Sequence, residues 1–238
     1  MCNFSVRIKQ KINHIIFGAF GFDAVSSTKI VERGDLKRLG SRYGGWVVPS
    51  SLLSKDSICY CAGCGEDISF DLELIEVYKC NVFAFDPTPR SAEYVLTNTI
   101  DNSKYHFCKL GLWNKRARLK FYAPKNINHV SHSLLNLQKT KGSIQVEVDS
   151  LKNIMKSNGH TYLDLLKLDI EGAEYKVLNS IFSNNIDIKV LCVEFDEMFN
   201  PLDEGYIQRI NDSINKLTKF GYIMVFNEGN GNYTFVKE

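Results

Sequence analysis

The segment from residue 163 to residue 178, LDLLKLDIEGAEYKVL, constrains this chain more than any other part of it. It begins as an apolar strand, yet it carries Lys167, Asp169 and Glu171 at every second position. Because alternate side chains of a strand point to the same face, Lys167 and Asp169 share a face, and Glu171 follows in a glycine-containing turn. Buried ionised groups are costly unless they are paired. Their place at the carboxyl end of a strand therefore predicts a functional site.

Short apolar runs alternate with helical patterns from about residue 57 onward. Strands are expected at 58–62, 82–85, 105–110, 163–169 and 188–195, and helices at 68–75, 90–97, 151–157, 173–182 and 203–220. This alternation is typical of an α/β fold, with a mostly parallel sheet covered by helices on both faces. Two runs that alternate like edge strands, 118–122 and 144–148, flank a polar insertion. The last run, 222–236, predicts an antiparallel edge hairpin.

The chain has 238 residues, 44% of them hydrophobic, which suits one sizeable domain. We expect an N-terminal extension over 1–50 and the main domain over 51–238. Residues 1–22 are basic and then apolar, with the spacing of an amphipathic helix. This helix either packs on the domain or makes a peripheral contact with the inner face of a membrane.

Bulk properties restrict the partners and the compartment. No apolar run reaches 18 residues, and a net charge of +2 gives no reason to expect a nucleic-acid partner. Seven cysteines at irregular spacings argue against a disulfide framework and favour the cytoplasm. Cys59, Cys61 and Cys64 could bind a metal, but buried thiols are the simpler interpretation, and we expect no metal.

A glycine loop, Gly63-Cys64-Gly65, follows the first strand of the expected sheet. Glycines there allow a ligand to approach the backbone. The next residues, Glu66 and Asp67, place carboxylates at the helix start, where they would repel a phosphate and suit a cation. Asp86 ends the next strand, at the spacing expected for a carboxylate that binds a ribose hydroxyl. The pattern favours a cationic nucleoside cofactor over a dinucleotide.

These motifs together resemble the FkbM family of S-adenosylmethionine-dependent methyltransferases. The most specific element is Lys167-Leu-Asp169-Ile-Glu171-Gly172-Ala-Glu174, which matches the family signature K-[ILV]-D-[VI]-E-G-x-E. Two segments depart from the usual pattern: Gly63-Cys-Gly-Glu66 replaces G-A-N-x-G, and Asp86-Pro-Thr-Pro89 replaces E-P.

The resemblance implies a class I methyltransferase (Rossmann-like) fold, S-adenosyl-L-methionine as cofactor, and O-methylation of sugars or natural products. The expected cofactor-binding residues are Gly63, Cys64, Gly65, Glu66, Asp67, Asp86, Pro87, Thr88, Leu110, Gly111 and Asp169.

The expected catalytic residues are Asp169, Glu171, Lys167 and His132. Asp169 either removes a proton from the acceptor or binds the ammonium group of the cofactor. Lys167 is expected to pair with Asp169 or with Glu194, because an unpaired buried ammonium would lose its proton.

Glu171 is expected to face the substrate, and Glu174 to be a solvated helix residue. His132 either lines the acceptor pocket or is a surface histidine.

The polar insertion 123–143 is rich in Asn, Ser, His and Lys, which suits a saccharide or another small hydroxylated acceptor. Tyr122, Trp113 and His132 could provide flat surfaces for sugar rings. We therefore expect O-methylation of a cell-surface polysaccharide or its precursor. The alternatives are O-methylation of a small metabolite and a non-catalytic cofactor-binding module.

Overall fold

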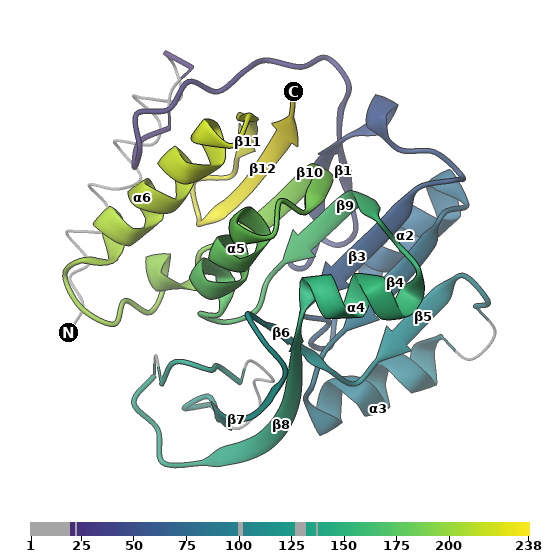
Figure 1. Ribbon diagram of the computed structural model, residues 1–238, viewed down its shortest axis with the longest axis vertical. Coiled ribbons are helices and arrows are strands. Elements are labelled where there is room, and N and C mark those ends of the chain that lie inside the picture. The colour runs from purple at the N-terminus through teal and green to yellow at the C-terminus, as the bar shows by residue number, and fades with distance from the viewer. Residues whose placement is uncertain (1–19, 22, 100–101, 127–131, 137) are drawn as a thin grey trace.

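The computed structural model describes residues 20–21, 23–99, 102–126, 132–136 and 138–238. Within these residues, seven strands form the central sheet, in the order β11-β12-β10-β9-β3-β4-β5 (Figure 1). The strands are β3 (Ile58–Ala62), β4 (Asn81–Phe85), β5 (Tyr105–Cys108), β9 (Tyr162–Leu168), β10 (Asp187–Glu194), β11 (Tyr222–Asn227) and β12 (Asn232–Lys237). Neighbours from β5 to β10 pair in parallel, whereas β12 is antiparallel to both β10 and β11. The sheet confirms the predicted α/β class and the terminal hairpin. In this hairpin, β12 lies between β10 and β11, and β11 forms the edge of the sheet.

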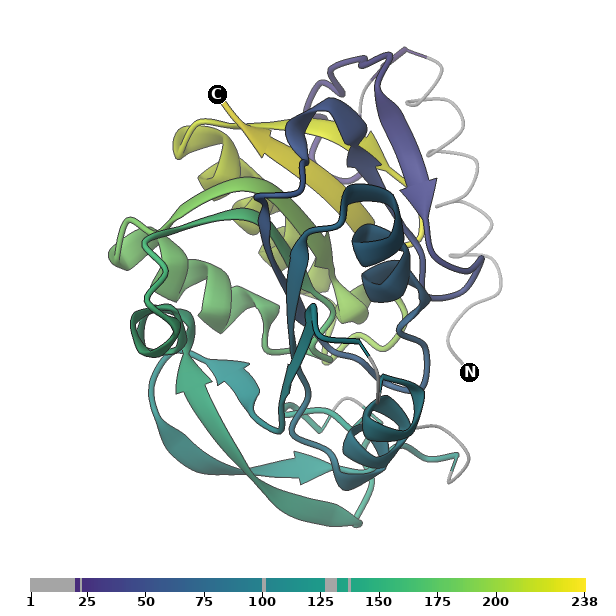
Figure 2. The same ribbon diagram turned by 90° about the vertical axis from the view of Figure 1, so that its right-hand side faces the viewer.

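Helices cover both faces of this sheet, as Figure 2 shows nearly edge-on. The helices are α2 (Ser69–Tyr78), α3 (Pro89–Asn98), α4 (Leu151–Asn158), α5 (Glu174–Ser183) and α6 (Tyr206–Lys219), with single turns η1 (Ser50–Leu52) and η2 (Asp196–Met198). Apolar residues of α4, α5 and α6 pack on one face, and those of α2 and α3 on the other. Local interactions set the ends of α4. At its start, the Ser150 side chain accepts a hydrogen bond from the Asn153 amide, and at its end Gly159 adopts a left-handed conformation.

A separate three-stranded sheet lies at the lower end of the molecule in Figure 1. It comprises β6 (Gly111–Trp113), β7 (Ala117–Tyr122) and β8 (Ser143–Ser150). The antiparallel pair β7–β8 confirms the two strands expected at 118–122 and 144–148. Strand β6, which pairs in parallel with β8, was not expected from the sequence.

The part of the chain before residue 50 contributes a hairpin to the main domain. Its strands are β1 (Leu36–Leu39) and β2 (Trp46–Pro49). Leu39, Trp46 and Val48 are buried in the same apolar cluster as the inner side of α2. The Thr234 hydroxyl on β12 also donates a hydrogen bond to the Val47 carbonyl, at 2.7 Å. Residues 36–49 therefore pack on the central sheet, and the division at residues 50 and 51 stays a prediction.

The N-terminal helix expected over residues 1–22 lies almost wholly outside the described residues. Among the residues described, no helix is long and apolar enough to cross a membrane.

Candidate active site

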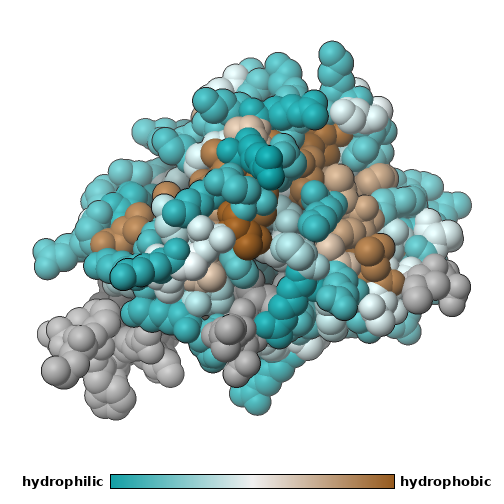
Figure 3. Space-filling model, turned by 90° about the horizontal axis from the view of Figure 1, so that it is seen from below, coloured by the Kyte–Doolittle hydropathy of each residue, from teal (hydrophilic) through white to brown (hydrophobic). Residues whose placement is uncertain are grey.

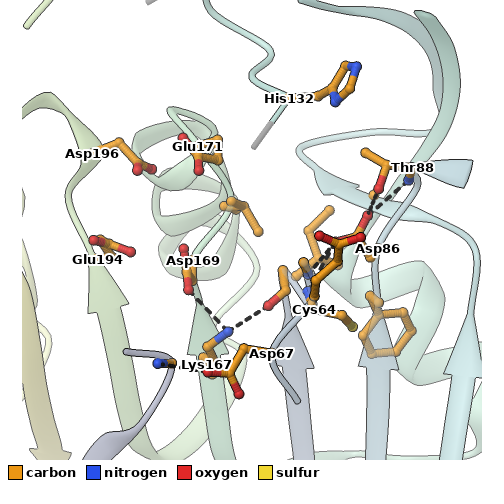
Figure 4. Close-up of a pocket in the computed structure, with 18 of the residues that line it drawn as sticks. Cys64, Asp67, Asp86, Thr88, His132, Lys167, Asp169, Glu171, Glu194 and Asp196 are labelled. Carbon is orange, nitrogen blue, oxygen red and sulfur yellow. Dashed lines mark hydrogen bonds and ion pairs between the residues drawn. The ribbon is translucent and has the colours of Figure 1, made fainter. Parts of the chain in front are cut away.

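A cavity of about 570 Å³ opens at the carboxyl ends of β3, β4, β9 and β10, the edge at which parallel α/β sheets bind ligands. Figure 4 shows two walls of it: one carries Asp86, Thr88 and Cys64, and the other carries the carboxylates that follow β9 and β10. The end of the molecule with the three-stranded sheet has apolar residues near its middle, surrounded by hydrophilic ones (Figure 3).

On the first wall, the carboxylate of Asp86 holds the glycine loop in place. Its Oδ2 accepts hydrogen bonds from the backbone amides of Cys64 and Gly65, at 3.0 and 3.1 Å, and from the Ser91 hydroxyl at 2.9 Å. Its Oδ1 accepts from the Thr88 amide and hydroxyl, at 2.9 and 2.7 Å. These five bonds fill the acceptor capacity of a carboxylate. Asp86 thus shapes the loop, and its contact with a ribose stays a prediction.

Gly63 is required by the close approach of β3 and β9. Its φ is +86°, and a Cβ atom there would lie 1.7 Å from the carbonyl oxygen of Asp169. Its amide donates to the Phe85 carbonyl at 2.9 Å, and its carbonyl accepts from Lys167 Nζ at 2.6 Å. Gly63 therefore allows the glycine loop to lie directly against the backbone of Asp169. This role is additional to the ligand approach expected from the sequence.

Lys167 is buried beneath the cavity and joins the two walls. Its side chain is 5% exposed, and Nζ lies 3.2 Å from Asp169 Oδ2. The buried carboxylate of Asp71 on α2, which accepts a hydrogen bond from the Tyr105 hydroxyl at 2.9 Å, is close enough to act on it electrostatically. Burial opposes the charge of Lys167, but Asp169 and then Asp71 outweigh burial and raise its pKa. The lysine therefore stays protonated, and the expected pairing with Asp169 is confirmed.

Asp169 and Glu194 form a carboxyl pair at adjacent strand ends. Register pairs Leu168 with Val193, so the next residues of both strands lie side by side, and both line the cavity (Figure 4). Burial, and then the hydrogen bond and the charge of Asp169, raise the pKa of Glu194 well above its ordinary value. Glu194 therefore favours its protonated form, beside the Asp169 carboxylate and the Lys167 ammonium.

The turn after β9 is fixed by a second carboxyl pair. The Gly172 amide donates to both Glu174 Oε1 and Asp196 Oδ2, each at 3.1 Å. Glu174 is 1% exposed, so the expectation of a solvated helix residue is wrong. Burial raises its pKa to about 7. Glu171 lines the cavity with a left-handed φ of +54°, a conformation that is strained for a residue with a side chain.

Glu66 and Asp67 line the cavity but are also bonded to neighbouring protein groups. Glu66 forms a two-pronged ion pair with Arg90, at 2.7 and 2.9 Å. Asp67 Oδ2 accepts from the Ser41 hydroxyl at 2.5 Å, and its Oδ1 accepts from the Ser69 hydroxyl at 2.6 Å. A cofactor role for these two acids stays a prediction.

Other predicted residues divide between those that line the cavity and those that do not. Pro87, Thr88, Gly111 and His132 line it. Leu110 packs against the main apolar cluster and is not among the lining residues of the described chain. Trp113 and Tyr122 belong to the three-stranded sheet and were expected to form flat sugar-binding surfaces. They too are not among the lining residues of the described chain.

Several lining residues were not found from the sequence. They include Arg42, Tyr43, Gly44 and Trp46 of the hairpin, Leu112 and Phe121 of the three-stranded sheet, and Phe199, Asn200, Asn230 and Asn232 near β10 and β12. None of them belongs to a recognisable motif, because long-range packing brings them to the cavity.

The described cysteines and acids show no arrangement for a metal. Cys59, Cys61 and Cys64 are buried, and Cys59 Sγ lies 3.9 Å from Cys80 Sγ. Among the described residues, no group of three or more His, Cys, Asp or Glu side chains is placed to hold a metal ion.

The donor set of the cavity fits S-adenosylmethionine. A sulfonium and an ammonium group are cations, and the cavity is lined by the acidic side chains of Asp169 and Glu171, which follow β9. The cofactor has no phosphate, and the turn between the glycine loop and α2 carries two acidic residues, Glu66 and Asp67, which would repel one.

Comparisons with solved structures return methyltransferases of very low sequence identity. Fibrillarin from Methanococcus jannaschii is 12% identical, with 90% of this chain and 84% of that chain covered and a TM-score of 0.47. A methyltransferase from Podospora anserina, solved with S-adenosylhomocysteine, is 9% identical, with 76% and 71% covered and a TM-score of 0.45. A precorrin-6y C5,15-methyltransferase from Geobacter metallireducens is 11% identical, with 78% and 83% covered and a TM-score of 0.43. No curated protein matches the chain.

The family comparison is decisive, because the model of the methyltransferase FkbM domain matches residues 60–224, more than half of the chain. The match includes the glycine loop, Asp86 and the whole signature around Asp169. The chain therefore belongs to the FkbM family of methyltransferases, and its methyl donor is S-adenosylmethionine.

Proposed function

We propose that this methyltransferase acts on oxygen, and that its acceptor is a sugar hydroxyl of a cell-surface glycan or of its precursor. The observation that carries the proposal is the placement of Asp169. Its carboxylate is 28% exposed, lines the cavity, and is held from below by the buried ammonium of Lys167. A carboxylate that is fixed and still accessible is suited to orient a hydroxyl group and to accept its proton.

The residues of the site divide the work of the reaction. When bound, S-adenosylmethionine supplies an electrophilic methyl group. Asp169 accepts a hydrogen bond from the acceptor hydroxyl and takes its proton as the oxygen becomes a nucleophile. Lys167 keeps Asp169 oriented through their ion pair, and Glu194, whose raised pKa favours its protonated form, lies beside Asp169. Gly63 allows the close approach of β3 and β9 that positions the Asp169 backbone next to the glycine loop.

The lining of the cavity supports a hydroxylated acceptor. Carboxylate and amide side chains, among them Glu194, Asn200 and Asn230, can accept or donate hydrogen bonds to several hydroxyl groups at once. A saccharide presents such groups on neighbouring carbons. Synthesis at the inner face of a membrane would bring a lipid-linked glycan precursor to an enzyme in the cytoplasm.

The test compares surface glycans by mass spectrometry in cells that carry wild-type or variant protein. Asp169→Asn keeps the shape of the side chain and removes its charge, so a methyl increment of 14 daltons should disappear from the glycan. Asp212→Asn is the matched control, because Asp212 is an exposed carboxylate on α6 that bonds only to Gln208, at 2.8 Å, among the described residues. An unchanged methylation pattern in the Asp169→Asn cells would contradict the proposal.

A further inference from the structure

The turn of the N-terminal hairpin holds an aromatic side chain at the mouth of the cavity. Tyr43 lines the cavity and is 89% exposed, the most exposed large hydrophobic side chain among the described residues. It lies outside the range matched by the family model, which begins at residue 60. An aromatic ring with so little burial contributes almost nothing to the stability of the fold.

This turn is nevertheless held firmly. The Ser41 hydroxyl donates to Asp67 Oδ2 at 2.5 Å and accepts from the amides of Tyr43 and Gly44, at 3.0 and 2.9 Å. The Gly44 amide also reaches Asp67 Oδ2 at 3.2 Å. The exposed ring is thus carried by an ordered backbone that is fixed to the start of α2. Ordered support for an exposed ring is typical of a binding surface.

The ring lines the same cavity as the carboxylates of Asp169 and Glu171. Partial desolvation, and then the carboxylates of Asp169 and Glu171, raise the pKa of the Tyr43 hydroxyl, so the hydroxyl lies within their electrostatic reach. A second aromatic side chain, Phe199, follows η2 at the end of β10, is 43% exposed, and lines the same cavity. Asn200, next to it, also lines the cavity.

We propose that Tyr43 and Phe199 form an acceptor subsite that binds the apolar face of a sugar ring while neighbouring carboxylate and amide groups bind its hydroxyls. A sugar ring has a flat face of C–H groups that packs on an aromatic ring, and a rim of hydroxyl groups that needs polar partners. The subsite deepens the proposed function and rests on it. It assigns acceptor recognition to the hairpin turn, a part of the chain that the signature motifs do not include.

The experiment measures binding of methyl α-D-mannopyranoside, methyl β-D-galactopyranoside and methyl α-L-rhamnopyranoside by saturation-transfer NMR, with the full chain and saturating S-adenosylhomocysteine. Loss of one stacked ring should weaken glycoside binding about five-fold or more in Tyr43→Ala. Tyr43→Phe keeps the ring and should bind within two-fold of wild type. Phe199→Ala is a second variant and should weaken binding in the same way. Tyr162→Ala is the matched control, because Tyr162 is 45% exposed but begins β9, at the opposite end of that strand from the cavity.

Calorimetry with S-adenosylhomocysteine and thermal unfolding complete the design. Both should be unchanged in Tyr43→Ala, since the ring is exposed and contacts the acceptor rather than the cofactor. If wild type binds a glycoside and Tyr43→Ala binds it equally well, or if the variant loses S-adenosylhomocysteine affinity instead, the subsite is refuted and the proposed function stands. If wild type binds S-adenosylhomocysteine but none of the glycosides, the saccharide acceptor itself is refuted, and the subsite with it.

Discussion

Lys167→Met should destabilise the protein strongly, because it removes the cation that compensates buried negative charge beneath the site. Methionine fills a similar volume without an ammonium group. Asp169 is 28% exposed and can be solvated by water, but Asp71 is 3% exposed and cannot. The Gly63 carbonyl also loses its donor at 2.6 Å. Burial already raises the pKa of Asp71, and Lys167 opposes that rise. The substitution therefore forces Asp71 either to stay charged without its cation or to take up a proton, and it leaves an unpaired carbonyl in the core.

The size of the effect follows from this burial. Breaking a buried ion pair by removing one partner costs about 3–5 kcal/mol. For a chain of this length, each kcal/mol lowers the melting temperature by roughly 2–4 °C, so a decrease on the order of 10 °C is expected. Denaturant unfolding at pH 7, followed by circular dichroism, gives the free energy of unfolding directly.

A second substitution separates charge from packing. Asp71→Asn removes the uncompensated charge, and its amide oxygen can still accept the hydrogen bond from Tyr105. The double variant Lys167→Met/Asp71→Asn should therefore recover about half of the loss, and a thermodynamic cycle should give a coupling of about 1 kcal/mol or more between the two positions. A Lys167→Met protein as stable as wild type, or the absence of coupling, would refute this account of the buried charges.

Three further predictions concern the signature turn and the glycine loop. The folded-state pKa of Glu174 is raised to about 7 from 4.5, so the folded protein keeps a proton that the unfolded chain has released between these values. The stability contributed by protonated Glu174 is therefore present at low pH and is lost as pH rises from about 4.5 to about 7. When the free energy of unfolding in urea is measured from pH 4.5 to 8, it should depend less on pH in Glu174→Gln than in wild type. Glu171→Gly should raise the free energy of unfolding by about 1 kcal/mol, by relieving the left-handed backbone, and should lower methyl transfer; equal or lower stability would contradict the strain. Gly63→Ala should cost several kcal/mol, since its Cβ would meet the Asp169 carbonyl at 1.7 Å, and thermal unfolding identical to wild type would exclude that clash.

Most strands of the sheet, and the pairing of Lys167 with Asp169 at the end of β9, were predictable because they depend on local periodicity. The alternation of Lys167 and Asp169 in a strand placed both on one face, and the structure pairs them at 3.2 Å. The burial of Glu174 also has a local signal in the sequence. It lies three and four positions before the buried Val177 and Leu178 of α5, so helical spacing already placed it on the inner face.

Other parts of the site could not be predicted from a single sequence. Tyr43 reaches the cavity because a hairpin packs on α2 and on a strand nearly two hundred positions later, through the bond between Val47 and Thr234. No local pattern encodes such a contact. Similarly, the position of Asp86 was predicted, but its five hydrogen-bond donors were not, since they depend on the conformation of the glycine loop.

The attachment of the hairpin turn has a consequence for how members of such a family diverge. The turn is joined to the rest of the protein by the Ser41–Asp67 hydrogen bond and by backbone contacts, while Arg42 and Tyr43 between these anchors bond to nothing through their side chains among the described residues. Under the proposed acceptor subsite, exchange of these two side chains should change the acceptor preference and leave the fold and the S-adenosylhomocysteine affinity unchanged.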